Sequence, residues 1–124
     1  MSEEVTIEAG GLKIRVEYRN FGGDRGPAMR VFGETERGPV QVLRFDCFDT
    51  DPHYHYDPDG MNGFHHLDRT VVPDVVAWSV AQLRLNIQEM VKTAGYADLA
   101  ERLDEKAIAE CADQVHAAIL ELTP

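Results

Sequence analysis

The fold is decided by Val5-Thr6-Ile7-Glu8-Ala9-Gly10-Gly11-Leu12-Lys13-Ile14-Arg15-Val16-Glu17-Tyr18. Apolar and polar residues alternate on both sides of Gly10-Gly11, which is the pattern of two strands that each bury one face. Two adjacent glycines can both adopt a positive φ and so form a two-residue hairpin turn. This turn places the apolar residues on one face, because it pairs Ala9 with Leu12, Ile7 with Ile14 and Val5 with Val16.

The strand pattern extends over a strand-rich half, residues 4–66. Residues 21–27 are rich in glycine and are predicted to be a loop. A second strand pair is expected at about 28–34 and 39–48. The apolar phase shifts between Val42 and Leu43, which indicates either a β-bulge or a strand that is buried on both faces.

A third hairpin is expected at residues 53–66. Its turn is Asp57-Pro58-Asp59-Gly60, which has proline and glycine at the second and fourth positions of a type I turn. Such a turn pairs Asp57 with Met61, so that Tyr54 faces Phe64 and His53 faces His65.

The pattern changes to helical spacing in a helix-rich half, residues 73–122. Ser79 and Gln82 resemble a capping box, and the apolar stripe that follows ends at Gly95. A second stripe runs from Leu99 to Leu122. Asp104 either starts a new helix or lies inside a continuous one, and we expect a break there. Strands followed by helices predict one α+β domain over residues 1–124. We expect an antiparallel sheet built from N-terminal hairpins and covered on one face by two or three C-terminal helices.

The composition excludes several classes of protein and partner. The chain has 124 residues, of which 44% are hydrophobic and 27% charged, as is typical of a globular domain. The formal net charge is −10, and residues 45–124 carry all of the excess. Because an acidic protein repels phosphate groups, we expect neither nucleic acid nor an anionic membrane as a partner. A homodimer or a protein partner stays open.

Nothing in the sequence indicates export or insertion into a membrane. No apolar run approaches the ~20 residues that span a bilayer, and Met1-Ser2-Glu3-Glu4 is unlike a signal peptide. Cys47 and Cys111 lack the spacing of a metal or redox motif, so we expect free, buried and poorly reactive thiols. A cytoplasmic protein is the resulting expectation.

The residues that carry chemistry concentrate between Asp46 and Asp68. This stretch holds histidines at positions 53, 55, 65 and 66 and aspartates at positions 46, 49, 51, 57, 59 and 68. Side chains alternate along a strand, so His53 and His55 point to the same face. The predicted hairpin brings His65 to that face as well and leaves Tyr54, Tyr56 and Phe64 on the other.

Three imidazoles with aspartates nearby favour a site for a divalent metal such as zinc, nickel or manganese. The candidate metal ligands are His53, His55, His65, His66 and Asp57. The same histidines can instead hydrogen-bond the aspartates or loop carbonyls without any ligand. A proton relay or a pH-responsive role is also open, because a carboxylate raises the pKa of a neighbouring imidazole.

Paired histidines also serve as acid and base in metal-free ribonucleases. The stretch itself contains no cation that could stabilise the negative charge of the reacting phosphorus centre. A ribonuclease would therefore need Arg30, Arg44 or Arg69 to approach the histidines in the fold.

Two short motifs, Arg44-Phe45-Asp46-Cys47-Phe48 and Pro52-His53-Tyr54-His55-Tyr56, resemble a family of small uncharacterised bacterial domains. The resemblance extends to residues 29–33 and 77–95 and covers roughly residues 27–100. The family has no established activity. The resemblance therefore implies a bacterial domain of unknown function and transfers no catalytic residues.

The sequence thus favours a binding or assembly domain without demonstrable catalysis. The first alternative is a divalent-metal-binding protein, such as a metal-dependent hydrolase, that uses the histidines and aspartates at 46–68. The second is the metal-free ribonuclease. A deep cleft over the histidines would favour the metal protein, and a flat or covered surface would favour the binding domain. Whether the protein is an enzyme stays open.

Overall fold

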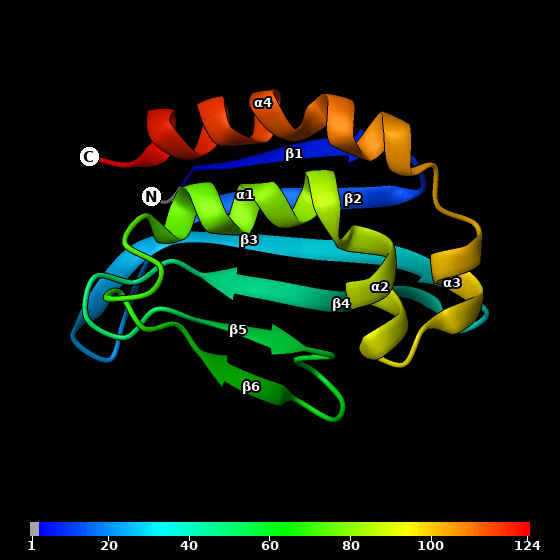
Figure 1. Ribbon diagram of the computed structural model, residues 1–124, viewed down its shortest axis with the longest axis horizontal. Helices are drawn as coiled ribbons and strands as arrows, with labels where there is room; N and C mark the ends of the chain where they lie inside the picture. The colour runs from blue at the N-terminus through cyan, green and yellow to red at the C-terminus, as the bar shows by residue number, and fades with distance from the viewer. Residues whose placement is uncertain (1–2) are drawn as a thin grey trace.

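The computed structural model describes residues 3–124, and Met1 and Ser2 lie outside the described residues. Six strands are followed by four helices (Figure 1). The strands are β1 (Glu4–Ala9), β2 (Leu12–Phe21), β3 (Asp24–Thr35), β4 (Gly38–Asp46), β5 (His53–Tyr56) and β6 (Gly63–His66). The helices are α1 (Val75–Leu85), α2 (Ile87–Thr93), α3 (Ala97–Glu101) and α4 (Glu105–Leu122).

The strands form one antiparallel sheet in chain order. The helices cover one face of this sheet: α4 packs on β1 and β2, α3 contacts β3, and α2 contacts β4 and β5. In Figure 1, β5 and β6 lie beyond α1 and α4. These observations confirm the predicted α+β fold with its N-terminal sheet. Residues 3–124 contain four helices, one more than the largest number predicted, because the helical half is interrupted between α1 and α2, between α2 and α3, and between α3 and α4.

The core lies between the sheet and the helices. Its largest fully buried side chains come from both layers: Ile14, Val16, Met29, Val31, Val42, Leu43 and Phe45 from the sheet, and Val80, Leu83, Ile87, Ile108 and Ile119 from the helices. The alternation along β2 and β3 explains this set, because every second side chain faces the helices.

The first hairpin has the predicted register. Ile7 lies opposite Ile14, and Gly10 and Gly11 have φ angles of 58° and 97°. Gly10 also touches the start of α4, where the backbone N–H of Asp104 donates to the carbonyl of Gly10 over 3.0 Å. A Cβ at position 10 would collide with the carbonyl of Asp104 and the side chain of Ile108. Both the turn and the close contact therefore require glycine here.

The phase shift in β4 is a β-bulge. Val31 pairs with Leu43 whereas Phe32 pairs with Gln41, so Val42 is the extra residue. After the bulge, Leu43 and Phe45 face the helices, and Arg44 and Asp46 lie on the face of the sheet away from the helices.

Residues 21–27 are not a loop, and that prediction was wrong. β2 continues to Phe21 and β3 begins at Asp24, with only Gly22-Gly23 between them. Both glycines have positive φ, at 59° and 85°, and they close a second tight hairpin. The residues on either side do not alternate cleanly, which concealed the strands.

The predicted register of the third hairpin was also wrong. His53 pairs with His66, Tyr54 with His65 and His55 with Phe64. The turn is longer than four residues, since both Asp57 and Asn62 have positive φ and the N–H of Asn62 donates to the carbonyl of Asp57. A shift of one residue exchanges the faces of a strand. Phe64 therefore joins the histidine face and His65 leaves it.

The helix starts differ from the prediction at one place and agree at another. Asp74, not Ser79, caps α1 by accepting from the N–H of Ala77. Ser79 lies inside α1 and donates to the carbonyl of Val75. The predicted break at Asp104 is confirmed, because its side chain caps α4. None of the helices in residues 3–124 has the length and apolar character that crossing a bilayer requires.

Both cysteines are free and buried, as predicted. Burial raises the pKa of the Cys47 thiol to about 11 and also raises the pKa of Cys111. Both thiols are therefore protonated at neutral pH, where the thiolate is the reactive form.

Replacing Ile14 by alanine should lower the free energy of unfolding by about 2–5 kcal/mol, because a fully buried side chain leaves a cavity. Lys13→Ala is the matched control on the opposite face of β2, where a change within about 0.5 kcal/mol is expected. Urea unfolding of both variants measures the difference. Equal losses, or no loss in Ile14→Ala, would contradict the register of the first hairpin.

Candidate functional site

The face of the sheet away from the helices, here called the open face, carries Arg15, Arg30, Arg44, Asp46, His53 and His55. At its β4–β5 end, Arg44 pairs with His55 and Asp46 pairs with His53. The strand period of two explains why these four polar side chains share a face, because positions 44 and 46, like 53 and 55, differ by two.

Asp46 lies at the centre of this group. Its side chain is fully buried, yet its oxygens accept hydrogen bonds from Arg19 Nη1 and Arg44 Nε, both over 2.9 Å. His53 Nε2 lies 3.0 Å from the Asp46 oxygen that Arg44 contacts. Burial alone would raise the pKa of Asp46, but the bonds from His53 and Arg44 and the charge of Arg19 hold it well below its usual range.

His53 is an imidazolium in this arrangement. Its Nε2 faces the carboxylate of Asp46, and its Nδ1 lies 2.8 Å from the backbone carbonyl of Asp51. Both partners only accept, so both ring nitrogens carry a proton. Burial opposes the charged form, but the bonds to Asp46 and Asp51 outweigh it and raise the pKa of His53 above 6.5. Phe64 stacks on the ring, with 4.4 Å between centroids.

His55 is neutral. Its Nε2 lies 3.1 Å from Arg44 Nη2, which can only donate, so Nε2 is the accepting nitrogen. Its Nδ1 lies 2.6 Å from the side-chain oxygen of Asn62 and carries the proton. Burial and the charge of Arg44 lower the pKa of His55, although the bond to Asn62 opposes them. The two imidazoles lie 4.9 Å apart between centroids and differ in charge.

A cavity of about 520 Å³ opens above this group and is called the anion cavity below. Its floor contains Arg19, Arg44, Asp46, His53 and His55, and its walls include Phe21, Phe48 and Phe64. Arg19 is held in place because its guanidinium lies over the rings of Phe21 and Phe48, 5.3 and 5.7 Å from their centroids. The Gly22-Gly23 turn, which was predicted to be part of a loop, forms another part of the rim.

The structure brings two of the five predicted metal ligands together, His53 and His55. His66 shares their face, but its Nδ1 lies 2.8 Å from the exposed carboxylate of Asp51. His65 lies on the other face and stacks on Tyr54. Asp57 is turned away, since its carboxylate accepts from the hydroxyl of Tyr96 over 2.6 Å.

Arg19 is the member of this group that the sequence reasoning did not name. Asp46 was counted among the aspartates of residues 46–68 and Arg44 was named as a cation that a ribonuclease would need, but neither was chosen as a site residue. Arg44 and Asp46 could have been found, because the buried parity of Leu43 and Phe45 leaves them on the polar face of the same strand. Arg19 gave no local signal, since it is 27 residues from Asp46 in the chain. Of the arginines needed for a ribonuclease, Arg44 reaches the histidines, whereas Arg69 donates to the carbonyl of Phe48.

Asp46, His53 and His55 are buried and could hold a metal ion, because each offers a donor atom within 4.8 Å of the other two. Imidazole nitrogen and carboxylate oxygen suit zinc or nickel. Arg44 competes with such an ion. Its guanidinium donates to the lone pair of His55 Nε2 and also to Asp46 Oδ2, the oxygen that faces His53.

Residues 6–119 match a family model described as Domain of unknown function (DUF7700). The chain belongs to this family. No curated protein and no solved structure matches the DUF7700 chain. The family result agrees with the resemblance to an uncharacterised domain family and assigns no activity to the DUF7700 site.

An NMR pH titration of the imidazole protons should show His53 titrating above 6.5 and His55 below it. Because the pKa of His53 is higher in the folded than in the unfolded chain, its imidazolium stabilises the fold fully below about pH 6.5, and this contribution is lost as the pH rises through the folded value. The reverse order of His53 and His55 would contradict the assigned proton positions.

Proposed function

We propose that the DUF7700 domain binds a small anionic ligand, a carboxylate or a phosphate, in the anion cavity and catalyses no reaction on it. The observation that supports this proposal is that two guanidinium groups, those of Arg19 and Arg44, face the single carboxylate of Asp46. This arrangement gives the floor of the cavity a local positive surplus. Asp24 and Asp51 also line the cavity, but the Asp24 carboxylate accepts from the backbone N–H groups of Arg25, Thr50 and Asp51, and the Asp51 carboxylate lies 2.8 Å from His66 Nδ1.

Both arginines retain donors for a ligand. Arg19 uses Nη1 and Arg44 uses Nε and Nη2 for bonds within the protein. Within residues 3–124, Arg19 Nη2 and Arg44 Nη1 donate to no protein acceptor. Guanidinium groups that are already oriented by neighbours lose little freedom on binding, and they suit the planar fork of a carboxylate or the oxygens of a phosphate.

The cavity itself supports a small-molecule ligand. Its volume of about 520 Å³ falls within the range of ~300–1,000 Å³ that is usual for such sites. A cleft over the histidines was the feature that favoured a metal protein on sequence grounds. The arginines in its floor change that inference, because they attract an anion and repel a cation.

The imidazoles favour binding over proton transfer. All four ring nitrogens of His53 and His55 already have partners in the protein: Asp46, Asp51, Asn62 and Arg44. A general acid or base needs a nitrogen within reach of the reacting group. These histidines instead hold Asp46 and Arg44 in place beneath the cavity.

A divalent metal at Asp46, His53 and His55 is the second candidate. It is supported by the Nδ1 bonds of both histidines to oxygen atoms, which leave both Nε2 atoms directed toward Asp46. Metal-binding histidines commonly have such partners on their second nitrogen. A metal would need Arg44 to move away from His55 Nε2, so the two candidates make opposite use of this arginine.

Inorganic phosphate should raise the melting temperature of the wild-type protein at constant ionic strength, because a ligand that binds the folded state stabilises it. Arg44→Gln should lose most of this shift. Phosphate also stabilises proteins non-specifically, so the matched control is Arg84→Gln, an arginine of α1 that pairs with Asp113 on the helix side. The proposal fails if Arg44→Gln and Arg84→Gln respond to phosphate alike.

Calorimetric titration of zinc, nickel and manganese tests the second candidate. We expect no stoichiometric binding tighter than about 10 μM by the wild type, well short of the affinity of complete metal sites, because Arg44 occupies the His55 lone pair. Arg44→Gln should gain affinity, and adding His55→Ala should remove the gain, whereas His65→Ala is the control that changes nothing. Tight wild-type binding that His55→Ala abolishes would establish the metal site instead.

A further inference from the structure

Three arginines stand opposite one another across the open face. Arg15 of β2 pairs with Arg30 of β3, and Arg30 pairs with Arg44 of β4. This set is called the arginine row below. It ends at His55 of β5, which is the cross-strand partner of Arg44, so the row leads from the middle of the sheet into the anion cavity.

Like charges directly opposite each other on neighbouring strands destabilise a sheet. The protein compensates two members of the row. Arg30 donates from Nε to Glu17 over 2.6 Å and from Nη1 to the side chain of Gln41 over 3.1 Å. Arg44 is compensated by Asp46. Arg30 and Glu17 therefore form a neutral, half-buried pair in the middle of the row.

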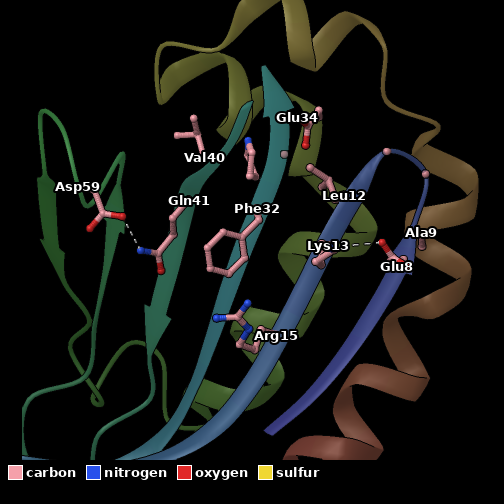
Figure 2. A pocket seen from close by; sticks show the side chains of 14 residues that line it. Glu8, Ala9, Leu12, Lys13, Arg15, Phe32, Glu34, Val40, Gln41 and Asp59 are labelled. Carbon is pink, nitrogen blue, oxygen red and sulfur yellow. Dashed lines mark hydrogen bonds and ion pairs between the residues drawn. The ribbon is translucent and has the colours of Figure 1, made fainter. Parts of the chain in front are cut away.

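Arg15 is compensated far less. Within residues 3–124 its guanidinium makes no hydrogen bond to a side chain, and the exposed carboxylate of Glu4 lies 3.7 Å from its Nε. The guanidinium instead lies over the ring of Phe32, 4.7 Å from the centroid. Figure 2 shows Arg15 beside this ring on the open face. Stacking orients the cation while its donors stay available.

A second cavity, of about 960 Å³, lies at this end of the open face. Glu34 also lines this cavity, and its carboxylate has no bonded partner among residues 3–124. Apart from Arg15, the remaining polar side chains are paired with one another. Lys13 pairs with Glu8, and Gln41 donates to Asp59 over 3.1 Å (Figure 2). Arg15 is the cation of this cavity that is oriented by an aromatic ring and lacks a hydrogen-bonded acceptor among the described residues.

We propose that the ligand of the DUF7700 domain is an elongated dianion whose two anionic groups bind at opposite ends of the arginine row. One group lies in the anion cavity on Arg44 and Arg19, and the other lies on Arg15. This proposal rests on the proposed function and names its ligand class, a molecule with two carboxylate or phosphate groups. The middle of the ligand crosses the neutral Arg30–Glu17 pair.

The sheet itself sets the length of this ligand. Arg15 and Arg44 are separated by two strand spacings of ~4.8 Å, so the anionic groups should be ~10 Å apart. The charge distribution along the chain favours an anion that lies along the arginine row. The acidic excess of the chain lies in residues 45–124, outside β2 and β3. An anion therefore meets attraction at the arginines of the row, although Glu8, Glu34 and Asp59 also line the cavity at its Arg15 end.

Dicarboxylates of increasing length, from succinate to sebacate, provide a ruler for this span, with acetate as the single-anion probe. Calorimetry on the wild type should show an affinity optimum near azelate, at least about tenfold above acetate, because the second contact is intramolecular once the first has formed. Arg15→Gln should bind acetate as the wild type does and lose the optimum. Lys13→Gln, which removes the same charge from the same strand, should keep it.

The melting temperature separates a binding role from a structural one. Arg15→Gln should leave it unchanged or higher, because the substitution removes a repulsion between like charges. A flat length profile in the wild type, or an optimum that survives in Arg15→Gln, overturns the dianion while acetate binding leaves the proposed function standing. Failure of acetate and all dicarboxylates to bind overturns the dianion, and it overturns the proposed function as well when phosphate gives no Arg44-dependent shift of the melting temperature.

Discussion

Side chains alternate between the two faces of a strand, and in an antiparallel meander the hairpin turns and any β-bulge decide which set of side chains faces which side. The Gly10-Gly11 turn directs Ile7 and Ile14 toward the helices. The bulge at Val42 then realigns β4, so that Leu43 and Phe45 enter the core while Arg44 and Asp46 reach the open face. The polar site and the apolar core are thus two results of the same registers.

The second constraint is the burial of Asp46. A carboxylate without solvent needs hydrogen-bonded cations, since an uncompensated buried charge is strongly unfavourable. Arg19 comes from β2, Arg44 from β4 and His53 from β5, so three different strands supply this compensation. The two buried oxygens of the Asp46 carboxylate therefore hold Arg19, Arg44 and His53 in the floor of the anion cavity, whose walls come from distant parts of the chain.

Local sequence signals predicted the elements whose geometry is decided locally. The first hairpin and the helix start at Asp104 each follow from a few neighbouring residues, whereas the phase shift in β4 left a bulge and a doubly buried strand as alternatives. His53 and His55 were placed on one face for the same reason. The strand register of the third hairpin could not be predicted from local signals. The first four residues of its turn already satisfy a type I pattern, but the positive φ of Asn62 makes the turn longer. Arg19 meets Asp46 through strand pairing across the sheet, and no local pattern encodes that contact.

The first and last elements of the fold depend on each other across the whole chain. α4 covers the apolar face of β1 and β2, and its first residues rest on the Gly10 turn. During synthesis at ~5–20 residues per second, the N-terminal hairpin waits roughly 5–20 s before α4 leaves the ribosome. Its Ile7, Leu12 and Ile14 side chains are uncovered during that time. The apolar face of this hairpin is therefore covered only after translation has passed α4, although the last strand of the sheet ends at His66.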